Sequence, residues 1–248
     1  MISPPVLKPA SLNCIDCPIK HRAVCAYCEK SEMAMLEMMK SYKTYPAGSP
    51  IIFAGDRMKF VGSVVTGVAR LSQTMEDGRR QMVGLLLPSD FVGRPGRSYA
   101  AFDVEATTDV ILCRFERKPF EKLLKDIPHL RERMLEMALD ELDSAREWML
   151  LLGRKTAREK IASLLIIIAR RQNAVQDETH TDVQFDLSLT REAMSEYLGL
   201  TLETVSRQIN ALKKDNIIAL EKKRRVVVKD FARLLSETGD DEDGGFLV

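Results

Sequence analysis

The sequence contains no long hydrophobic run, and this absence excludes a membrane-spanning helix. Its most apolar stretch, residues 164–169, is six residues long, whereas a helix that crosses a bilayer needs about 20 apolar residues. The N-terminus also lacks the charged, apolar and small-residue pattern of a secretory signal peptide. We therefore expect a soluble cytoplasmic protein with no membrane contact, in a reducing compartment where structural disulfides are rare.

Sequence motifs of enzyme chemistry are missing as well. The chain has only three histidines, His21, His129 and His180, and their positions match no catalytic triad and no metal-binding spacing. It also lacks a glycine-rich loop of the kind that holds nucleotide phosphates. We therefore expect that the protein is not an enzyme, and a redox enzyme that uses its cysteines is the less favoured interpretation.

Length and charge distribution indicate two domains. The chain has 248 residues, 45% of them hydrophobic and 29% charged, with a formal net charge of +1. Residues 154–236 carry 16 Lys and Arg against 11 Asp and Glu, whereas residues 237–248 carry five acids and no base. We expect a basic C-terminal domain at 154–236, followed by a disordered acidic tail at 237–248.

The first half of the chain has the pattern of a small β domain. Eight of the thirteen glycines lie between Gly48 and Gly96, interleaved with short apolar runs. Many short strands joined by tight turns predict a β roll, which we place at residues 42–118. Asp77 and Gly78 favour the positive φ of a hairpin turn. A cysteine-containing loop and a short helix precede the roll, at residues 1–41.

Helical signals replace strand signals after Pro119. No proline follows Pro128, and apolar residues repeat at alternating spacings of three and four: Leu135, Ala138, Leu142, Ala145, Met149 and Leu152. This stripe predicts one long helix over residues 119–153, with a break at Gly153. Small alanines let two helices approach closely, so the stripe favours a homodimer seam over packing within one domain.

Residues 188–229 have the pattern of a winged helix-turn-helix. Thr190 and Thr201 are placed to cap two short helices, and Gly199 ends the first of them. Two short β segments separated by a basic turn follow, and they predict a two-stranded wing. A helix pair of this kind, joined by a turn that contains glycine, is a candidate for binding DNA.

The second helix of this pair carries side chains suited to reading bases. Glu203, Ser206 and Arg207 lie at i, i+3 and i+4 and so share one face. Arginine pairs with guanine, glutamate accepts from the cytosine amino group, and serine contacts either kind of group. The starts of the two helices supply groups that are expected to bind phosphates: Thr190, Arg191, Thr201 and Thr204. The alternative is that Glu203 and Arg207 form a surface ion pair and nothing more.

The cysteines require a separate explanation. Cys14, Cys17, Cys25 and Cys28 fall within fifteen residues, and Cys113 follows 85 positions later. Such a group in a reducing compartment favours metal or redox chemistry over disulfides. Zinc is one candidate, but the seven residues between the two CxxC pairs are fewer than the usual spacing of about 12–20, and zinc leaves Cys113 unused. A redox CxxC should begin a helix after a strand, a context that this segment lacks.

The order of these elements, with Glu203, Ser206 and Arg207 in an ExxSR pattern, resembles the CRP/FNR superfamily of bacterial transcription regulators, and the FNR type within it. The similarity covers nearly the whole chain. It implies an α+β fold, with an N-terminal β roll of the cyclic-nucleotide-binding jelly-roll type, a long dimerisation helix and a C-terminal winged helix-turn-helix. It further implies a homodimeric activator that binds double-stranded DNA at a TTGAT-like inverted repeat. RNA polymerase is the expected partner, with residues 77–80 as a candidate contact by analogy.

FNR-type regulators bind a [4Fe-4S] cluster through N-terminal cysteines and one cysteine after the roll. By this resemblance the expected ligands are Cys14, Cys17, Cys25 and Cys113, and the C-x2-C-x7-C spacing is similar to that of the FnrL/FnrN subgroup. Cys28 is then either an extra cysteine or the ligand in place of Cys25. The resemblance implies that the cluster controls dimerisation in response to oxygen.

Two features depart from the patterns of the superfamily. The arginine of a cyclic-nucleotide site is missing, because Arg97-Ser98 lies too early and DVEATTD stands where that arginine is expected. Ala145 occupies the seam position at which FNR-type proteins are expected to carry an acid, although Asp143 and Glu147 lie nearby. The alternative interpretation is a CRP-like regulator that is stabilised by zinc or gated by another ligand.

Overall fold

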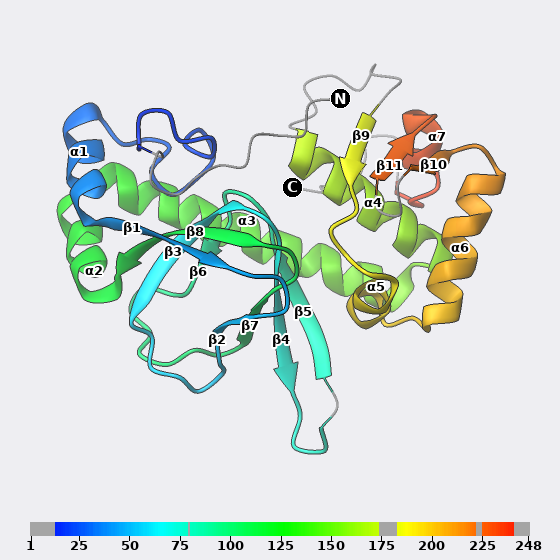
Figure 1. Ribbon diagram of the computed structural model, residues 1–248, viewed down its shortest axis with the longest axis horizontal. Helices are drawn as coiled ribbons and strands as arrows, with labels where there is room; N and C mark the ends of the chain where they lie inside the picture. Colours follow the sequence, from blue (N-terminus) through cyan, green and yellow to red (C-terminus); the bar gives the residue numbers. More distant parts are fainter. Residues whose placement is uncertain (1–12, 79, 174–182, 222–224, 241–248) are drawn as a thin grey trace. The chain divides into compact units, whose positions relative to one another are not determined.

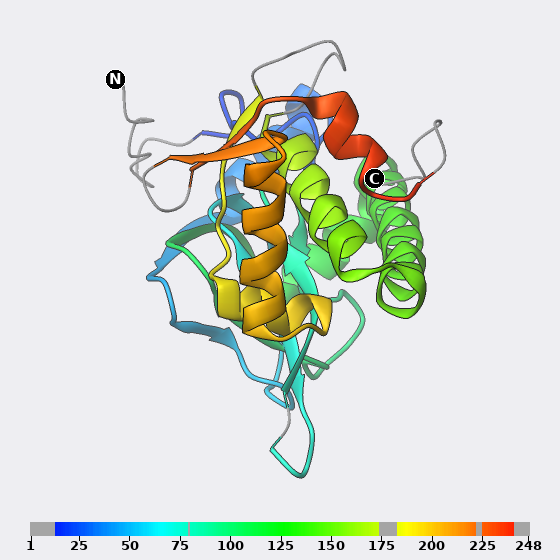
Figure 2. The ribbon, with the colours of Figure 1, turned by 90° about the vertical axis from the view of Figure 1, so that its right-hand side faces the viewer.

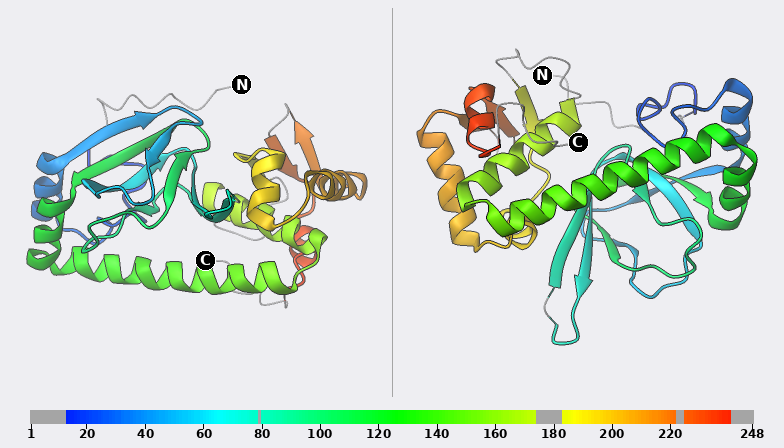
Figure 3. Two further views of the ribbon diagram at one scale, coloured as in Figure 1. Left: turned by 90° about the horizontal axis from the view of Figure 1, so that it is seen from below. Right: turned by 180° about the vertical axis from the view of Figure 1, so that it is seen from behind.

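The computed structural model describes residues 13–78, 80–173, 183–221 and 225–240 (Figure 1). The chain divides into two compact units, Met1–Ala138 and Leu139–Val248, and helix α3 (Pro128–Arg154) contributes to both. Figure 3 shows α3 as a continuous helix. None of the helices in the described ranges is long and apolar enough to cross a membrane.

The first unit contains the predicted β roll. Two four-stranded antiparallel sheets have the strand orders β1-β8-β3-β6 and β2-β7-β4-β5. The strands are β1 (Lys40–Tyr45), β2 (Pro50–Ile52), β3 (Phe60–Thr66), β4 (Ala69–Thr74), β5 (Arg80–Leu86), β6 (Phe91–Val92), β7 (Asp103–Ala106) and β8 (Val110–Glu116). The β4–β5 hairpin turns at Gly78, whose φ of +84° is the positive value that Asp77-Gly78 predicts.

Strand β8 is buried on both faces because each face packs against a different layer. Val110 and Leu112 lie in the core between the two sheets. Ile111, Cys113 and Phe115 lie on the opposite face, in a second core. That second core is formed by the N-terminal loop, helix α1 (Lys30–Met39), helix α2 (Arg117–Asp126) and the start of α3. The outer face of the β1-β8-β3-β6 sheet is therefore covered, and Cys113 is buried on it.

The prediction of one continuous helix over residues 119–153 is wrong, because two helices occupy this segment. Helix α2 ends at Asp126, and α3 begins at Pro128. Ile127 has extended backbone angles, φ −112° and ψ 102°, because the ring of a following proline disfavours the helical region. Gly153 does not break α3, which continues to Arg154. The break lies at residues 155–156, where the Thr156 backbone N–H donates to the side chain of Glu159 at 2.6 Å and starts the next helix.

The second unit is a winged helix-turn-helix. Its elements are α4 (Ala157–Asn173), β9 (Val183–Asp186), α5 (Arg191–Leu198), α6 (Leu202–Lys214), β10 (Ile218–Glu221), β11 (Arg225–Val228) and α7 (Phe231–Ser236). Figure 2 faces α6, with α5 beside its N-terminal end. The two wing strands pair as predicted, and β9 adds a third strand in the order β10-β11-β9 that the sequence analysis missed. The basic wing turn, residues 222–224, lies outside the described residues.

The first four residues assigned to the acidic tail belong to the packed second unit. The side chain of Thr238 is completely buried, and the carboxylate of Asp240 pairs with the Lys155 ammonium at 2.6 Å. Glu237 is held by Arg158 through two hydrogen bonds. These ion pairs and the buried threonine order residues 237–240, so the expectation of disorder from 237 onward is wrong for them. Residues 241–248 lie outside the described part of the chain.

Candidate functional site

The four N-terminal cysteines lie on a loop of consecutive tight turns. Backbone hydrogen bonds from Lys20 to Cys17, from Ala23 to Ile19 and from Cys28 to Cys25 close three of these turns at 2.9–3.2 Å. The loop is anchored by side chains that are buried in the second core: Ile19, Ala23 and Val24. A loop that is held by its apolar residues keeps its thiols on the inner side, toward the sheet.

The structure brings all five cysteines into one core. Cys14 and Cys113 are buried, Cys17, Cys25 and Cys28 are half-buried, and every thiol is free. Cys113 therefore lies in the same core as the N-terminal cysteines, the outer core of the roll. No three His, Cys, Asp or Glu side chains of the described residues are grouped closely enough to hold a single metal ion.

Mutual electrostatics distinguish Cys25 from Cys28. Burial raises the pKa of the Cys113 thiol, and the neighbouring Cys14, Cys17 and Cys25 raise it further. Burial also raises the pKa of Cys28 to about 12, but the thiol that adds to this shift is that of Cys25. The three cysteines that act most strongly on Cys113 are thus the three that the sequence resemblance selects.

Glu37 of α1 holds the first cysteine. The Cys14 backbone N–H donates to Glu37 Oε2 at 2.6 Å, and the Lys40 ammonium pairs with the same carboxylate at 2.8 Å. Partial burial raises the pKa of Glu37, but the hydrogen bonds from Cys14 and Lys40 outweigh it and lower the pKa overall. Burial and the hydrogen bond to Glu37 raise the pKa of the Cys14 thiol to about 12.

Two buried hydroxyl groups on the strands beside Cys113 have no hydrogen-bond partner in the described part of the chain. They belong to Tyr42 in β1 and Ser63 in β3. Buried polar groups in native proteins are nearly always paired, so unpaired hydroxyls beside a group of thiols are compatible with an acceptor that binds there. Sulfur atoms of an iron–sulfur cluster accept such hydrogen bonds. The four cysteines and these hydroxyls are therefore groups that could hold the predicted cluster and donate to its sulfur atoms.

Polar contacts tie the cysteine loop and α1 to the first turns of α3. Arg133 donates to the backbone carbonyl of Arg22 at 2.8 Å. His129 Nδ1 lies 3.1 Å from the carboxylate of Glu32. A hydrogen bond to Glu136 raises the pKa of the Tyr27 hydroxyl, so this tyrosine is also connected to α3. The loop that carries the cysteines thus contacts the long helix directly.

The helix-turn-helix has the capping geometry that the sequence predicts. Thr190 accepts from the Ala193 backbone N–H at 3.0 Å, and Thr201 accepts from the Thr204 backbone N–H at 3.2 Å. Gly199 ends α5 in the left-handed conformation, with φ of +60°. Thr190, Thr201 and the start of each helix are exposed or half-exposed, so the predicted phosphate-binding positions are accessible.

One face of α6 is exposed and polar. Glu203 and Arg207 are exposed and Ser206 is half-exposed, while the opposite face packs inward through buried residues: Val205, Ile209 and Leu212. The structure thus places the three predicted base-reading residues together. Asn210 continues the same face, and its i+7 spacing from Glu203 is a signal that the sequence analysis missed.

Arg191 is less accessible than a phosphate-binding residue usually is. Its side chain is half-buried along α5 and donates to the sulfur of Met194 at 3.6 Å. Burial lowers the pKa of its guanidinium, which nevertheless stays charged because arginine does not deprotonate in proteins. Of the predicted phosphate contacts, Arg191 is the one that must move outward to reach DNA.

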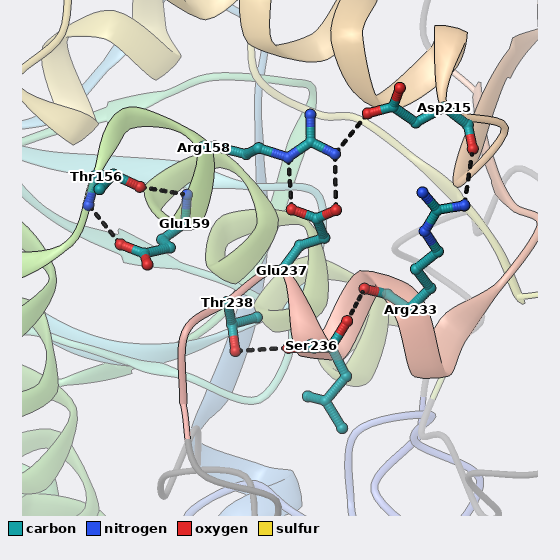
Figure 4. Close-up of polar contacts among 9 residues, drawn as sticks. Thr156, Arg158, Glu159, Asp215, Arg233, Ser236, Glu237 and Thr238 are labelled. Carbon is teal, nitrogen blue, oxygen red and sulfur yellow. Dashed lines mark hydrogen bonds and ion pairs between the residues drawn. The ribbon is translucent and has the colours of Figure 1, made fainter.

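The guanidinium of Arg158 joins three helices of the second unit. It donates to Asp215, the C-cap of α6, at 2.7 Å and to both carboxylate oxygens of Glu237, the C-cap of α7, at 2.5 and 2.7 Å (Figure 4). The hydrogen bonds from Arg158 lower the pKa of Glu237, as expected for a carboxylate that faces a fixed cation. Because Arg158 lies in the first turn of α4, this contact sets the direction of α6.

Helix α5 is supported by the long helix and by α4. Trp148 of α3 stacks on Tyr197 of α5, with ring centroids 3.7 Å apart. The buried Lys160 of α4 donates to the carbonyl of Leu198 at the end of α5, at 3.3 Å. The end of α3 and the helix-turn-helix are therefore packed as one body within the second unit.

A β roll, a long helix with an exposed apolar stripe and a winged helix-turn-helix are the elements of a DNA-binding regulator. Comparison with known proteins identifies the group. Residues 42–126 match the family described as "Cyclic nucleotide-binding domain", and residues 159–237 match the "Crp-like helix-turn-helix domain". The chain belongs to the CRP/FNR family of DNA-binding transcription regulators, which confirms the predicted fold class and the prediction that it is not an enzyme.

Relatives in this family are similar over nearly the whole chain. The "Transcriptional activator protein FnrL" of Cereibacter sphaeroides is 67% identical over 95% of this chain and 96% of its own. The "Transcriptional activator protein Anr" of Pseudomonas protegens is 30% identical over 94% and 95%. The solved structure of FixK2 from Bradyrhizobium japonicum is 32% identical and superposes with a TM-score of 0.71 over 79% of this chain and 95% of that one.

Proposed function

We propose that this protein is an oxygen-responsive transcriptional activator whose DNA binding is controlled by a [4Fe-4S] cluster at Cys14, Cys17, Cys25 and Cys113. The observation that carries the proposal is that these four cysteines lie in one core, the outer core of the roll, which also contains the start of α3. The similarity to FnrL over the full chain supports it. When bound, the cluster supplies the oxygen-labile group of the site.

The chain's own contacts provide the route from the cysteines to the dimer. Arg133 of α3 binds the loop at the Arg22 carbonyl, and His129 of α3 contacts Glu32 of α1. A bound cluster would also join the loop to β8 through Cys113. The predicted seam on α3 leaves large apolar side chains exposed, with Leu135 at 61%, Leu142 at 46% and Met149 at 67%. A second copy of the chain is the occupant that a self-complementary stripe of this kind accepts. Loss of the cluster would release the loop from β8 and so change the affinity with which two α3 helices pair.

DNA recognition follows from the exposed face of α6. Glu203, Ser206 and Arg207 contact base edges, and a dimer presents two such helices about one DNA turn apart, which suits a TTGAT-like inverted repeat. The helix starts at Thr190, Arg191, Thr201 and Thr204 bind the phosphates on either side. Activation requires RNA polymerase, and the exposed β4–β5 hairpin around Asp77 is the proposed contact.

One experiment tests the proposal as a whole. The protein is purified without oxygen, its visible absorption is recorded, and iron, acid-labile sulfide and zinc are assayed. We expect a brown protein with iron and sulfide that bleaches in air, and band-shift binding to a TTGAT inverted repeat that falls on bleaching, with a scrambled duplex as control. A colourless, iron-free protein with stoichiometric zinc would contradict the oxygen-sensor proposal and support the zinc-stabilised alternative.

A further inference from the structure

Cys113 lies between two hydroxyl-bearing residues of the neighbouring strands. Its Cα partner in β1 is Tyr42, and its Cα partner in β3 is Ser63. Residues directly opposite each other in antiparallel strands point to the same face of the sheet. Both side chains therefore lie on the face of Cys113, which packs against the cysteine loop. Ser63 has Val61 and Val65 on either side of it on this face, and both valines belong to the same outer core.

Neither hydroxyl has a hydrogen-bond partner among the residues that the structure describes. Tyr42 OH and Ser63 Oγ are both inaccessible to solvent and unpaired, and the Ser63 residue is 2% exposed. A valine or an alanine would fill either strand position without leaving a polar group unpaired in an apolar layer, because only a partner makes a buried hydroxyl favourable. Two such groups on opposite sides of one cysteine indicate that something at Cys113 accepts hydrogen bonds.

Tyr42 and Ser63 lie in closely packed surroundings beside the cysteines. Its ring packs in the core that contains the N-terminal cysteines, and the Lys40 ammonium lies over the ring, 4.8 Å from its centroid. Gly62, next to Ser63, brings β3 close to the cysteine, because a Cβ at this position would lie 2.2 Å from the Cys113 carbonyl oxygen. A cluster bound by the cysteines of this core would bring further sulfur atoms to the face of the sheet that carries Cys113, Tyr42 and Ser63.

We propose that the Tyr42 and Ser63 hydroxyls donate hydrogen bonds to sulfur atoms of the cluster that Cys113 would bind. The inference rests on the proposed function, since the acceptor is the cluster. Donors to cluster sulfurs stabilise the more reduced, more negative state and so raise the reduction potential. Tyr42 and Ser63 are thus positioning residues that slow the loss of the cluster in air.

The test uses Tyr42→Phe, Ser63→Ala and the double variant of the full-length protein, purified without oxygen. Each substitution removes one hydroxyl and leaves the strand intact. Loss of visible absorbance in air-saturated buffer should be about three- to tenfold faster in each single variant, the factor that one hydrogen bond of ordinary net strength provides. Matched controls are Tyr45→Phe and Ser72→Ala, which remove buried hydroxyls elsewhere in the roll and should bleach at the wild-type rate.

A second measurement separates this role from a structural one. In cluster-free protein the two hydroxyls have no hydrogen-bond partner within the described ranges, so Tyr42→Phe and Ser63→Ala should leave the Tm unchanged or raise it. A lower Tm of the cluster-free variants, or bleaching at the wild-type rate in all three, would overturn the inference while the oxygen-sensor proposal stands. Wild-type protein without iron and sulfide would instead defeat the proposed function itself, so the two failures are distinguishable.

Discussion

At the scale of single residues, the position of Cys113 explains how one distant cysteine can complete a loop site. Every second residue of β8 faces the outer core, and Cys113 shares this face with Ile111 and Phe115. A cysteine one position earlier or later in the strand would point to the opposite face of the sheet, away from the cysteine loop, since side chains alternate along a strand. Cys113 therefore lies on the face of β8 that packs against the cysteine loop.

Cysteine substitutions test the ligand set at this scale. Cys25→Ala and Cys113→Ala should abolish the visible absorption of protein purified without oxygen, because each removes one of four thiolate ligands. Cys28→Ala should retain it, since Cys28 is the cysteine outside the proposed ligand set. Iron and sulfide assays on the three variants check the result. If Cys25→Ala kept the visible absorption and Cys28→Ala lost it, the third ligand of the loop would be Cys28.

Arg207→Ala tests base reading by α6. The exposed guanidinium is the group on this face that can pair with guanine, so we expect a loss of about 5- to 100-fold in affinity for the TTGAT inverted repeat. Binding to a scrambled duplex should change little. Arg57→Ala, an exposed arginine of the roll, serves as control in the same band-shift titration. Equal losses on both duplexes would indicate that Arg207 contacts phosphate only.

At the scale of elements, α6 is aimed by contacts outside the helix-turn-helix itself. Arg158 at the start of α4 holds the end of α6 through Asp215 and the end of α7 through Glu237. The segment after α7 adds the Lys155–Asp240 pair. Residues 237–240 therefore act as a clasp on the DNA-binding unit, although their composition alone suggests a disordered tail.

Removal of this clasp should destabilise the DNA-binding unit in a way that depends on pH. Arg158→Ala leaves two carboxylates without their cation and should cost about 1–3 kcal/mol of unfolding free energy. Arg158 lowers the pKa of Glu237 in the folded state, so the stabilisation is complete above the unfolded-state pKa of about 4.3 and is lost as the pH falls through the folded pKa. Denaturant titrations at pH 7 and pH 3 should differ by less in Arg158→Ala than in the wild type.

Arg133 is the matching contact between the cysteine loop and α3. Arg133→Ala removes the hydrogen bond to the Arg22 carbonyl and leaves the cysteines untouched, so cluster content should be retained. We expect the ratio between oxygen-free and air-exposed DNA affinity to fall by roughly tenfold, as the loss of one charge-assisted hydrogen bond allows. Arg131→Ala, an exposed arginine of the same helix, should keep the wild-type ratio. An unchanged ratio in Arg133→Ala would assign the coupling to Cys113 and β8 alone.

At the scale of the whole molecule, the proposed assembly is a pair of chains joined along α3. Ala145 is exposed on this helix, in line with the exposed leucines and Met149. The acids on either side do not replace an acid at this position in a simple way, because Asp143 already pairs with Arg146 at 3.0 Å. Arg146 therefore offsets the charge of Asp143, whereas burial and the nearby Asp240 and Asp143 raise the pKa of Glu147.

Ala145→Asp should weaken the pairing of cluster-free chains. Two new carboxylates would face each other across a two-fold seam, where like charges are unfavourable, and we expect the dimer dissociation constant to rise at least about tenfold. Ala145→Ser, which is polar but uncharged, is the control. Sedimentation of both variants without cluster measures the effect, and a wild-type dissociation constant for Ala145→Asp would place the seam elsewhere on α3.

The sequence by itself determined the elements whose signals are local. Glycine spacing and turn residues predicted the roll, the Thr190, Gly199 and Thr201 caps predicted the helix-turn-helix, and the i, i+4 spacing of Glu203 and Arg207 predicted a shared face. Each of these depends on neighbouring residues only, so that backbone preferences suffice. Pro128 is a local signal for the break at Ile127, but the prediction of one long helix gave more weight to the apolar stripe that follows.

Only the tertiary structure decided which distant residues meet. The pairing of β1 and β3 with β8 places Tyr42 and Ser63 beside Cys113, and no local pattern encodes that register. The same holds for β9, which pairs with β11 across the helix-turn-helix, and for residues 237–240, whose acids are ordered by Lys155 and Arg158 some 80 positions earlier. Contacts of this kind form because burial and ion pairing reward proximity in space, whereas sequence patterns report proximity along the chain.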